Sequence, residues 1–194
     1  MEKIILASQS PRRKELLQLA EIDFEVIVSE TDESFPPNLS FEETAIFIAK
    51  QKAIAVAKSN KNRTILAADT IVICNNKILG KPKDRDDAVK MLSELSNNTH
   101  QVITAVCLLK NEIEHSFADV TTVTFHTLTQ EQIAYYIDTY KPYDKAGAYG
   151  IQDWIGAVGI KKIEGDFYNV MGLPISRVVE KLKVVENGLG FRSL

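Results

Sequence analysis

HQVITAVCLLK, residues 100–110, and EHSFADVTTVTFHTL, residues 114–128, decide the fold class of this chain. Both stretches are long and rich in β-branched and other apolar residues, and they meet near the polar segment NEIE at 111–114. This pattern predicts two long strands that pair in antiparallel fashion. Such a pair excludes a purely parallel, doubly wound sheet and predicts a mixed one.

Helical segments and shorter strands surround this pair. KIILAS (3–8) predicts a buried strand, and PRRKELLQLA (11–20) predicts a helix with Ser10 as N-cap and Pro11 at its first position. Ser40 and Glu43 have the spacing of a capping box, which predicts the start of a long helix. Further helices are predicted at 83–95, 129–140 and 174–183, and further strands at 23–29 and 63–80. We therefore expect one α/β domain over residues 1–194, with a mixed, twisted sheet flanked by helices.

The amino-acid composition limits the kinds of binding partner that we expect. A net charge of −3, with 45% hydrophobic and 25% charged residues, is typical of a soluble globular protein. The acidic balance argues against a nucleic-acid or membrane-surface binder, so we expect neither partner. MEKIILASQS at the start is too short and too acidic for a signal peptide, and we expect a cytoplasmic location. Cys74 and Cys107 lie in apolar runs without metal-type spacing, which predicts buried, reduced thiols.

Basic residues lie where the first strand turns into the first helix. Ser8, Arg12 and Arg13 surround this turn, and a helix N-terminus with guanidinium groups beside it is suited to a phosphate. An ordinary helix start with solvated arginines explains the same residues, and is the better interpretation of this motif alone. Lys81 is held between Gly80 and Pro82, which suits either a phosphate ligand or a plain turn lysine.

Carboxylates supply a second group of candidates. Asp69 lies in the otherwise apolar run ILAADTIVI (65–73), where a buried carboxylate is costly unless it is paired or binds a metal. We favour a functional role over the alternative of a strand end capped by this residue. Glu33 lies in the loop SETDE (29–33), which alone is best interpreted as a solvated acidic loop. Lys52, on the long helix, is by default a surface lysine.

The segment AGAYGIQ (146–152) combines glycines with an aromatic residue and an amide. Tyr149 and Gln152 suit a loop that approaches a planar base, although a Gly-rich turn in the core explains the segment nearly as well. Together with the carboxylates and the basic residues, this loop points to metal-dependent cleavage of a phosphoanhydride. Because the sequence has no Walker-type loop and no Ser-His-Asp signal, water is the expected nucleophile.

The ordered motifs LASQSPRR, DE, AADT, GKP, DKAGAYGIQ and GLP resemble the Maf family of nucleotide pyrophosphatases along nearly the whole chain. The resemblance implies a two-lobed fold related to the inosine-triphosphate pyrophosphatases, with the active site in the cleft between the lobes. It also implies hydrolysis of a nucleoside triphosphate to the monophosphate and pyrophosphate, supported by a divalent cation, Mg²⁺ or Mn²⁺. The family suggests a homodimer.

Family roles fall on matching positions of this sequence. Asp69 would accept the proton of the attacking water and engage the metal, and Glu33 would assist in metal or water binding. The residues that would hold the triphosphate are Ser8, Arg13, Lys52 and Lys81.

Three positions separate the branches of the family. Arg12, Thr70 and Gln152 match the dTTP/UTP branch, whereas the 7-methyl-GTP branch has Trp, Gln and Glu there. The Gln152 amide can pair with both the donor and the acceptors of a uracil or thymine edge. Asp153 and Trp154 stand where the family usually has glycine.

Two other functions stay open at this point. One is a pyrophosphatase for other or modified nucleotides, including the purines ITP and XTP. The other is a nucleotide-sensing regulator of septum formation that does not catalyse hydrolysis. The cellular role would be either housecleaning of the nucleotide pool or arrest of cell division.

Overall fold

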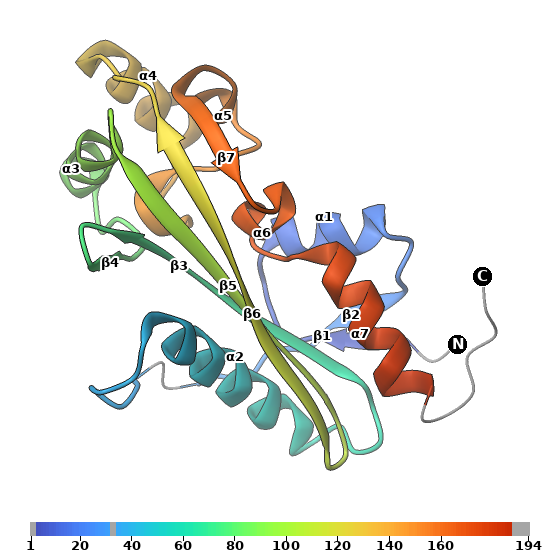
Figure 1. Cartoon of the computed structure of the whole chain (residues 1–194). Helices are drawn as coiled ribbons and strands as arrows, with labels where there is room; N and C mark the ends of the chain where they lie inside the picture. The colour runs from blue at the N-terminus through green and yellow to red at the C-terminus, as the bar shows by residue number, and fades with distance from the viewer. Residues whose placement is uncertain (1–2, 32–33, 188–194) are drawn as a thin grey trace. The chain divides into compact units, whose positions relative to one another are not determined.

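The computed structural model describes residues 3–31 and 34–187 of the chain (Figure 1). These residues divide into two compact units. The first unit takes its described residues from Met1–Asp69, Thr104–Asp119 and Gly172–Leu194. The second unit comprises Thr70–Ile103 and Val120–Met171.

The strands form a mixed sheet, as predicted. Among the described residues it has seven strands: β1 (Ile4–Leu6), β2 (Phe24–Val26), β3 (Ile65–Cys74), β4 (Lys77–Leu79), β5 (Thr99–Lys110), β6 (Ile113–Phe125) and β7 (Ile160–Glu164). Their order is β2-β1-β3-β5-β6-β7, and β4 pairs with β3. β1 is parallel to both β2 and β3, whereas β3–β4 and β6–β7 are antiparallel. Only residues 111 and 112 connect β5 to β6, so this central pair is a hairpin and the predicted antiparallel pairing is confirmed.

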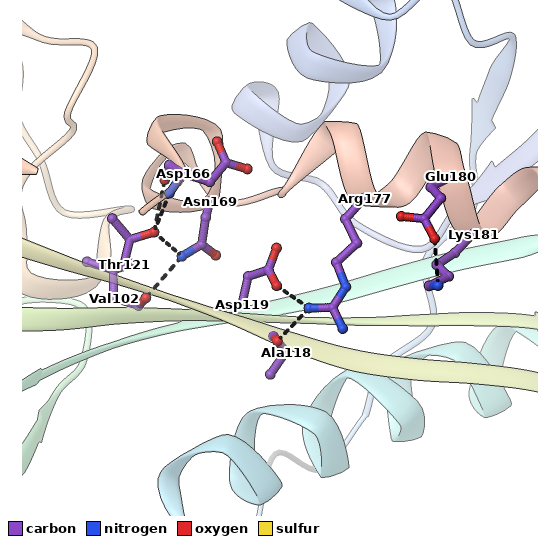
Figure 2. Close-up of polar contacts among 9 residues, drawn as sticks. All are labelled: Val102, Ala118, Asp119, Thr121, Asp166, Asn169, Arg177, Glu180 and Lys181. Atoms are coloured by element: carbon purple, nitrogen blue, oxygen red, sulfur yellow. Dashed lines mark hydrogen bonds and ion pairs between the residues drawn. The ribbon is translucent and has the colours of Figure 1, made fainter. Parts of the chain in front are cut away.

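The first unit carries the parallel strands and three helices, α1 (Pro11–Leu19), α2 (Phe41–Ala57) and α7 (Ile175–Asn187). The predicted capping box of α2 is present: Ser40 Oγ accepts from the Glu43 backbone N–H, and Glu43 Oε2 accepts from the Ser40 N–H. Helix α7 is tied to β6 through Arg177, whose guanidinium donates to Asp119 and to the Ala118 carbonyl oxygen (Figure 2).

The second unit has its own hydrophobic core. It contains α3 (Arg85–Leu95), α4 (Gln130–Tyr140), the short 3₁₀ turn η1 (Ala146–Ala148), α5 (Trp154–Gly159) and α6 (Phe167–Met171). α3 packs against α4 and η1. The core residues include Leu92, Phe125, Ile133 and Tyr136, all 1% exposed or less.

Helix α6 is fixed by a buried asparagine. Asn169 Nδ2 donates to the Val102 carbonyl oxygen at 3.1 Å and to Thr121 Oγ1 at 2.8 Å (Figure 2). Thr121 also exchanges hydrogen bonds with the backbone of Asp166, just ahead of α6. Polar contacts to β5 and β6 therefore position this short helix.

Three short elements, α5, β7 and α6, were not predicted. The glycines in α5 weaken the helical pattern, because glycine is a poor helix former. β7 is an edge strand with mostly exposed residues, so it lacks an apolar run. Both cysteines are buried free thiols, as expected. No helix within 3–31 and 34–187 is long and apolar enough to cross a membrane.

Candidate active site

Asp69 and Lys52 form an ion pair in the first unit. Lys52 Nζ lies 2.7 Å from Asp69 Oδ1, and the two side chains are only 19% and 15% exposed. Charges this far from water need a partner, because desolvation costs several kcal/mol for each isolated ion. The default expectation of a surface lysine was therefore wrong, and the carboxylate has the partner that its apolar strand demanded.

Local structure explains how these two side chains meet. β3 continues through Asp69 without a break, so this residue lies within a strand and the alternative of a strand end is wrong. On α2 the buried residues Ala45, Ala49 and Val56 lie on one face. Lys52 comes three residues after Ala49 and four before Val56, so the helical repeat places it on that same face.

Ser8 and Arg13 form a second contact in the first unit. Arg13 Nη1 donates to Ser8 Oγ at 3.0 Å, and Arg13 Nε donates to the Gly172 carbonyl oxygen at 2.8 Å. Ser8 Oγ also accepts from the Ser10 backbone N–H at 3.2 Å. The guanidinium is thus held from both sides beside the N-terminus of α1, although Arg13 itself is half-buried.

The first turn of α1 is suited to an anion. Pro11 occupies its first position and Ser10 is the N-cap, as predicted, but the Ser10 side chain makes no capping hydrogen bond. A helix N-terminus carries positive partial charge and offers backbone N–H donors. Arg12, also half-buried, adds a second guanidinium in this turn.

Both contacts lie beyond the residues over which β1 pairs with β3, on the side of the carboxyl end of β1. The Ala7 backbone N–H donates to the Leu66 carbonyl oxygen at 2.8 Å, which sets the register of β1 against β3. Ser8 directly follows Ala7, and Asp69 lies three residues beyond Leu66. This part of the first unit therefore contains a carboxylate, an ammonium and a guanidinium.

Three candidate residues belong to the second unit. Thr70 is the residue after Asp69 in β3 and is half-buried. Lys81 is exposed, and the Gly80 carbonyl oxygen before it accepts from the Gly147 N–H at 3.0 Å. Gln152 is exposed in a turn ahead of α5. Each is described within its own unit, and the pairing of these residues with the first unit stays a prediction.

Tyr149 does not face outward from the Gly-rich segment. It is 5% exposed, and its hydroxyl lies 2.7 Å from His100 Nε2. Burial lowers the pKa of His100 to about 4, so this imidazole is neutral at pH 7. Gly147 and Ala148 ahead of the tyrosine both have positive φ, 68° and 59°. The alternative of a Gly-rich turn in the core therefore holds for Tyr149, whereas the approach of the segment to a base through Gln152 stays a prediction.

A metal ion would have few protein ligands among the described residues. Within 3–31 and 34–187, no three His, Cys, Asp or Glu side chains form a group that could hold one. Glu33 lies outside the described residues. Mg²⁺ in nucleotide sites is usually held by one or two carboxylates together with substrate phosphates and water. The single carboxylate of Asp69 fits that mode of binding, and it does not fit an all-protein cage.

The chain is similar to known proteins along nearly its whole length. A dTTP/UTP pyrophosphatase from Bacillus cytotoxicus is 50% identical over 188 residues, which cover 97% of this chain and 98% of the relative. A protein of the same name from Cytophaga hutchinsonii is 49% identical over 184 residues, or 95% of this chain and 84% of the relative. Another from Bacteroides fragilis is 49% identical over 183 residues, or 93% and 95%. The model of the Maf-like protein family matches residues 3–185, and the chain therefore belongs to this family.

Proposed function

We propose that this chain hydrolyses dTTP and UTP to the monophosphate and pyrophosphate. The observation that carries the proposal is the Asp69–Lys52 pair, 2.7 Å apart and largely withdrawn from water, in the same unit as the Arg13–Ser8 contact. The relatives named dTTP/UTP pyrophosphatase support the substrate class. The two units together act as one catalytic domain over residues 1–194.

Asp69 accepts the proton of the attacking water in this proposal. A carboxylate within a mostly apolar strand is shielded from bulk solvent, which strengthens its electrostatic interactions. Lys52 orients it through the contact to Oδ1. Because an ammonium group carries three N–H donors, Lys52 can hold Asp69 and a phosphate oxygen together. The water attacks the α-phosphorus in line, and pyrophosphate leaves.

The triphosphate is held by the basic residues. Ser8 and Arg13, together with the N-terminal turn of α1, provide hydroxyl, guanidinium and backbone N–H donors. Lys81 adds a positive charge toward the leaving pyrophosphate. In the proposal these groups contact phosphate oxygens on which negative charge develops during the reaction. Fixed donors at such oxygens stabilise the transition state and so accelerate the reaction.

Asp69 and Glu33 would hold the divalent cation, Mg²⁺ or Mn²⁺, together with phosphate oxygens. When bound, such an ion neutralises phosphate charge and lowers the pKa of a coordinated water. One carboxylate from β3 and one from the acidic loop would give the ligand number that Mg²⁺ sites in nucleotide enzymes commonly have.

The base is read by Arg12, Thr70 and Gln152. A side-chain amide presents both a donor and an acceptor, as a uracil or thymine edge requires. The substrate is a free nucleotide in the cytoplasm rather than a nucleic acid or a membrane component, in keeping with the net charge of −3. We also propose a homodimer, which light scattering after gel filtration tests.

The test compares substrates, metals and variants. Wild-type protein is assayed on dTTP, UTP, ITP and 7-methyl-GTP, with Mg²⁺, Mn²⁺ or EDTA, and pyrophosphate is resolved from orthophosphate. We expect pyrophosphate from dTTP and UTP only, lost in EDTA. Asp69→Asn is expected to lower kcat by about 10²–10⁴-fold, the range for a general base. Asp138→Asn, which breaks an exposed ion pair with Arg85, is the matched control.

Other results of the same assay would favour one of the two alternative functions or remove Asp69 from the mechanism. Turnover of ITP in preference to dTTP would favour the purine enzyme. Nucleotide binding without turnover would favour the sensor of septum formation. Asp69→Asn with wild-type kcat would remove Asp69 from the reaction.

A further inference from the structure

The turn that carries Gln152 is closed by its own backbone. The Asp153 N–H donates to the Gly150 carbonyl oxygen at 3.0 Å, so residues 150–153 form a tight turn just before α5. Gln152, the exposed residue in this turn, is the one proposed to read the base.

A buried tyrosine from α4 holds both ends of this turn. Tyr136 Oη donates to Asp153 Oδ2 at 2.7 Å and accepts from the Gly150 backbone N–H at 3.0 Å. The Tyr136 side chain is 0% exposed, and its neighbours in the core fix its ring. Burial and the hydrogen bond to Asp153 raise the pKa of Tyr136, so its hydroxyl keeps the proton that it donates.

Gly150 provides the space in which two side chains pack. A Cβ on Gly150 would lie 2.6 Å from Asp153 Oδ2 and 3.0 Å from Gln152 Nε2. The Gln152 amide nitrogen and the Asp153 carboxylate therefore lie against the same glycine. The Lys145 side chain is 13% exposed, and its Nζ lies 3.9 Å from Asp153 Oδ2. It therefore places a positive charge near this carboxylate.

We propose that Tyr136 and Asp153 are positioning residues that hold the Gln152 amide in the orientation that selects a uracil or thymine edge. The inference rests on the proposed function. The two ends of an amide are opposite in hydrogen bonding, one a donor and one an acceptor. A turn fixed at both ends limits the reorientation of this group and lowers the entropy lost on binding the base.

Cytosine is the informative competitor. It carries an amino donor where thymine and uracil carry a carbonyl acceptor. A Gln152 amide turned around would therefore pair with cytosine instead of thymine or uracil. A site built to pair with a substrate group rejects the analogue lacking it much more strongly than an apolar pocket does. Loss of positioning should therefore appear in the ratio of kcat/KM for dTTP over that for dCTP.

The experiment removes one hydroxyl. Tyr136→Phe keeps the buried ring but leaves the Gly150 N–H and Asp153 Oδ2 without the hydroxyl. We expect the dTTP/dCTP ratio of kcat/KM to fall about tenfold, with KM for dTTP raised and kcat within about twofold of wild type. Tyr135→Phe, the same change at the neighbouring, 51% exposed tyrosine, is the control expected to leave both constants unchanged.

A second pair of variants separates positioning from simple stability. Asp153→Ala should reproduce the loss seen in Tyr136→Phe. Asp153→Asn retains an acceptor oxygen for the Tyr136 hydroxyl, so it should restore the ratio to within about threefold of wild type. A purely structural role would lower the melting temperature and reduce kcat/KM for both nucleotides equally, which would overturn the inference.

The failure of this inference is distinguishable from failure of the proposed function. A wild-type protein without selective release of pyrophosphate from dTTP would contradict the proposed function itself. A selective wild type whose ratio is unchanged in both Tyr136→Phe and Asp153→Ala would contradict only the positioning role. Gln152→Ala must also lower the ratio, and an unchanged ratio there would overturn the inference directly.

Discussion

The Asp69–Lys52 pair should stabilise the fold as well as serve the reaction. Lys52→Met keeps the length of the side chain but leaves the Asp69 carboxylate without its cationic partner at Oδ1. Breaking a fully buried pair costs about 3–5 kcal/mol. Since these side chains are 19% and 15% exposed, we expect a smaller loss, about 2–3 kcal/mol in the free energy of unfolding. For a chain of this length that corresponds to a melting temperature lower by about 4–12 °C.

A double-mutant cycle measures the pairwise interaction itself. Lys52→Met, Asp69→Asn and the double variant are unfolded in urea, and we expect a coupling of about 1–2 kcal/mol. The control cycle uses Arg85 and Asp138, whose side chains are 48% and 51% exposed, and should give about 0.5 kcal/mol or less. If the Lys52 and Asp69 variants are additive to within about 0.3 kcal/mol, the pair does not hold the carboxylate as we argue.

Three further predictions concern caps, pH and close packing. Ser40→Ala removes the side-chain cap of α2 and should cost about 1 kcal/mol, whereas Ser10→Ala, where the side chain makes no cap, should cost less than about 0.5 kcal/mol in urea unfolding. Burial lowers the pKa of His100 from 6.5 to about 4. As pH falls, His100 is therefore protonated in the unfolded chain before it is protonated in the folded one. The free energy of unfolding decreases progressively between about pH 6.5 and 4. His100→Gln should remove about 3 kcal/mol of that decline in equilibrium unfolding followed across this range, and an unchanged decline would exclude His100 as its source. Gly156→Ala places a Cβ 1.8 Å from a backbone carbonyl oxygen and should lower the melting temperature sharply, whereas Gly80→Ala, with nothing within 4 Å, should leave it nearly unchanged.

Elements with local signals were predictable. The capping box of Ser40 with Glu43 starts α2 where the sequence predicts, and α4, predicted at 129–140, begins with a second box, Thr129 with Gln132. Each cap is formed by residues three apart, so no tertiary information is needed to recognise it. The long apolar runs of β3 and β5 could be recognised equally well, because strands buried over most of their length require such runs.

The Lys52–Asp69 contact could be predicted only in part from the sequence. Asp69 was conspicuous as a carboxylate within an apolar strand, and a partner was the physical requirement. The helical repeat also offered a signal, since Lys52 falls on the same face as Ala49 and Val56. What no local pattern states is that this face of α2 meets β3, because that contact depends on the assembled unit.

The contacts that hold the turn around Gln152 could not be predicted from sequence. Tyr136 and Asp153 are 17 residues apart and meet only through the packing of α4 against the turn. Helical periodicity predicts that Tyr136 shares a buried face with Ile133, but it does not say what the hydroxyl contacts. The same limit explains Tyr149, where glycines and an aromatic residue indicated a binding loop and the ring lies in the core with His100.

The position of water attack tests the central claim most directly. The protein hydrolyses dTTP in water enriched in ¹⁸O, and both products are examined by mass spectrometry. Attack on the α-phosphorus, with Asp69 as the base, predicts that the label enters the thymidine monophosphate and that pyrophosphate stays unlabelled. Label in the pyrophosphate, or release of orthophosphate, would contradict the account.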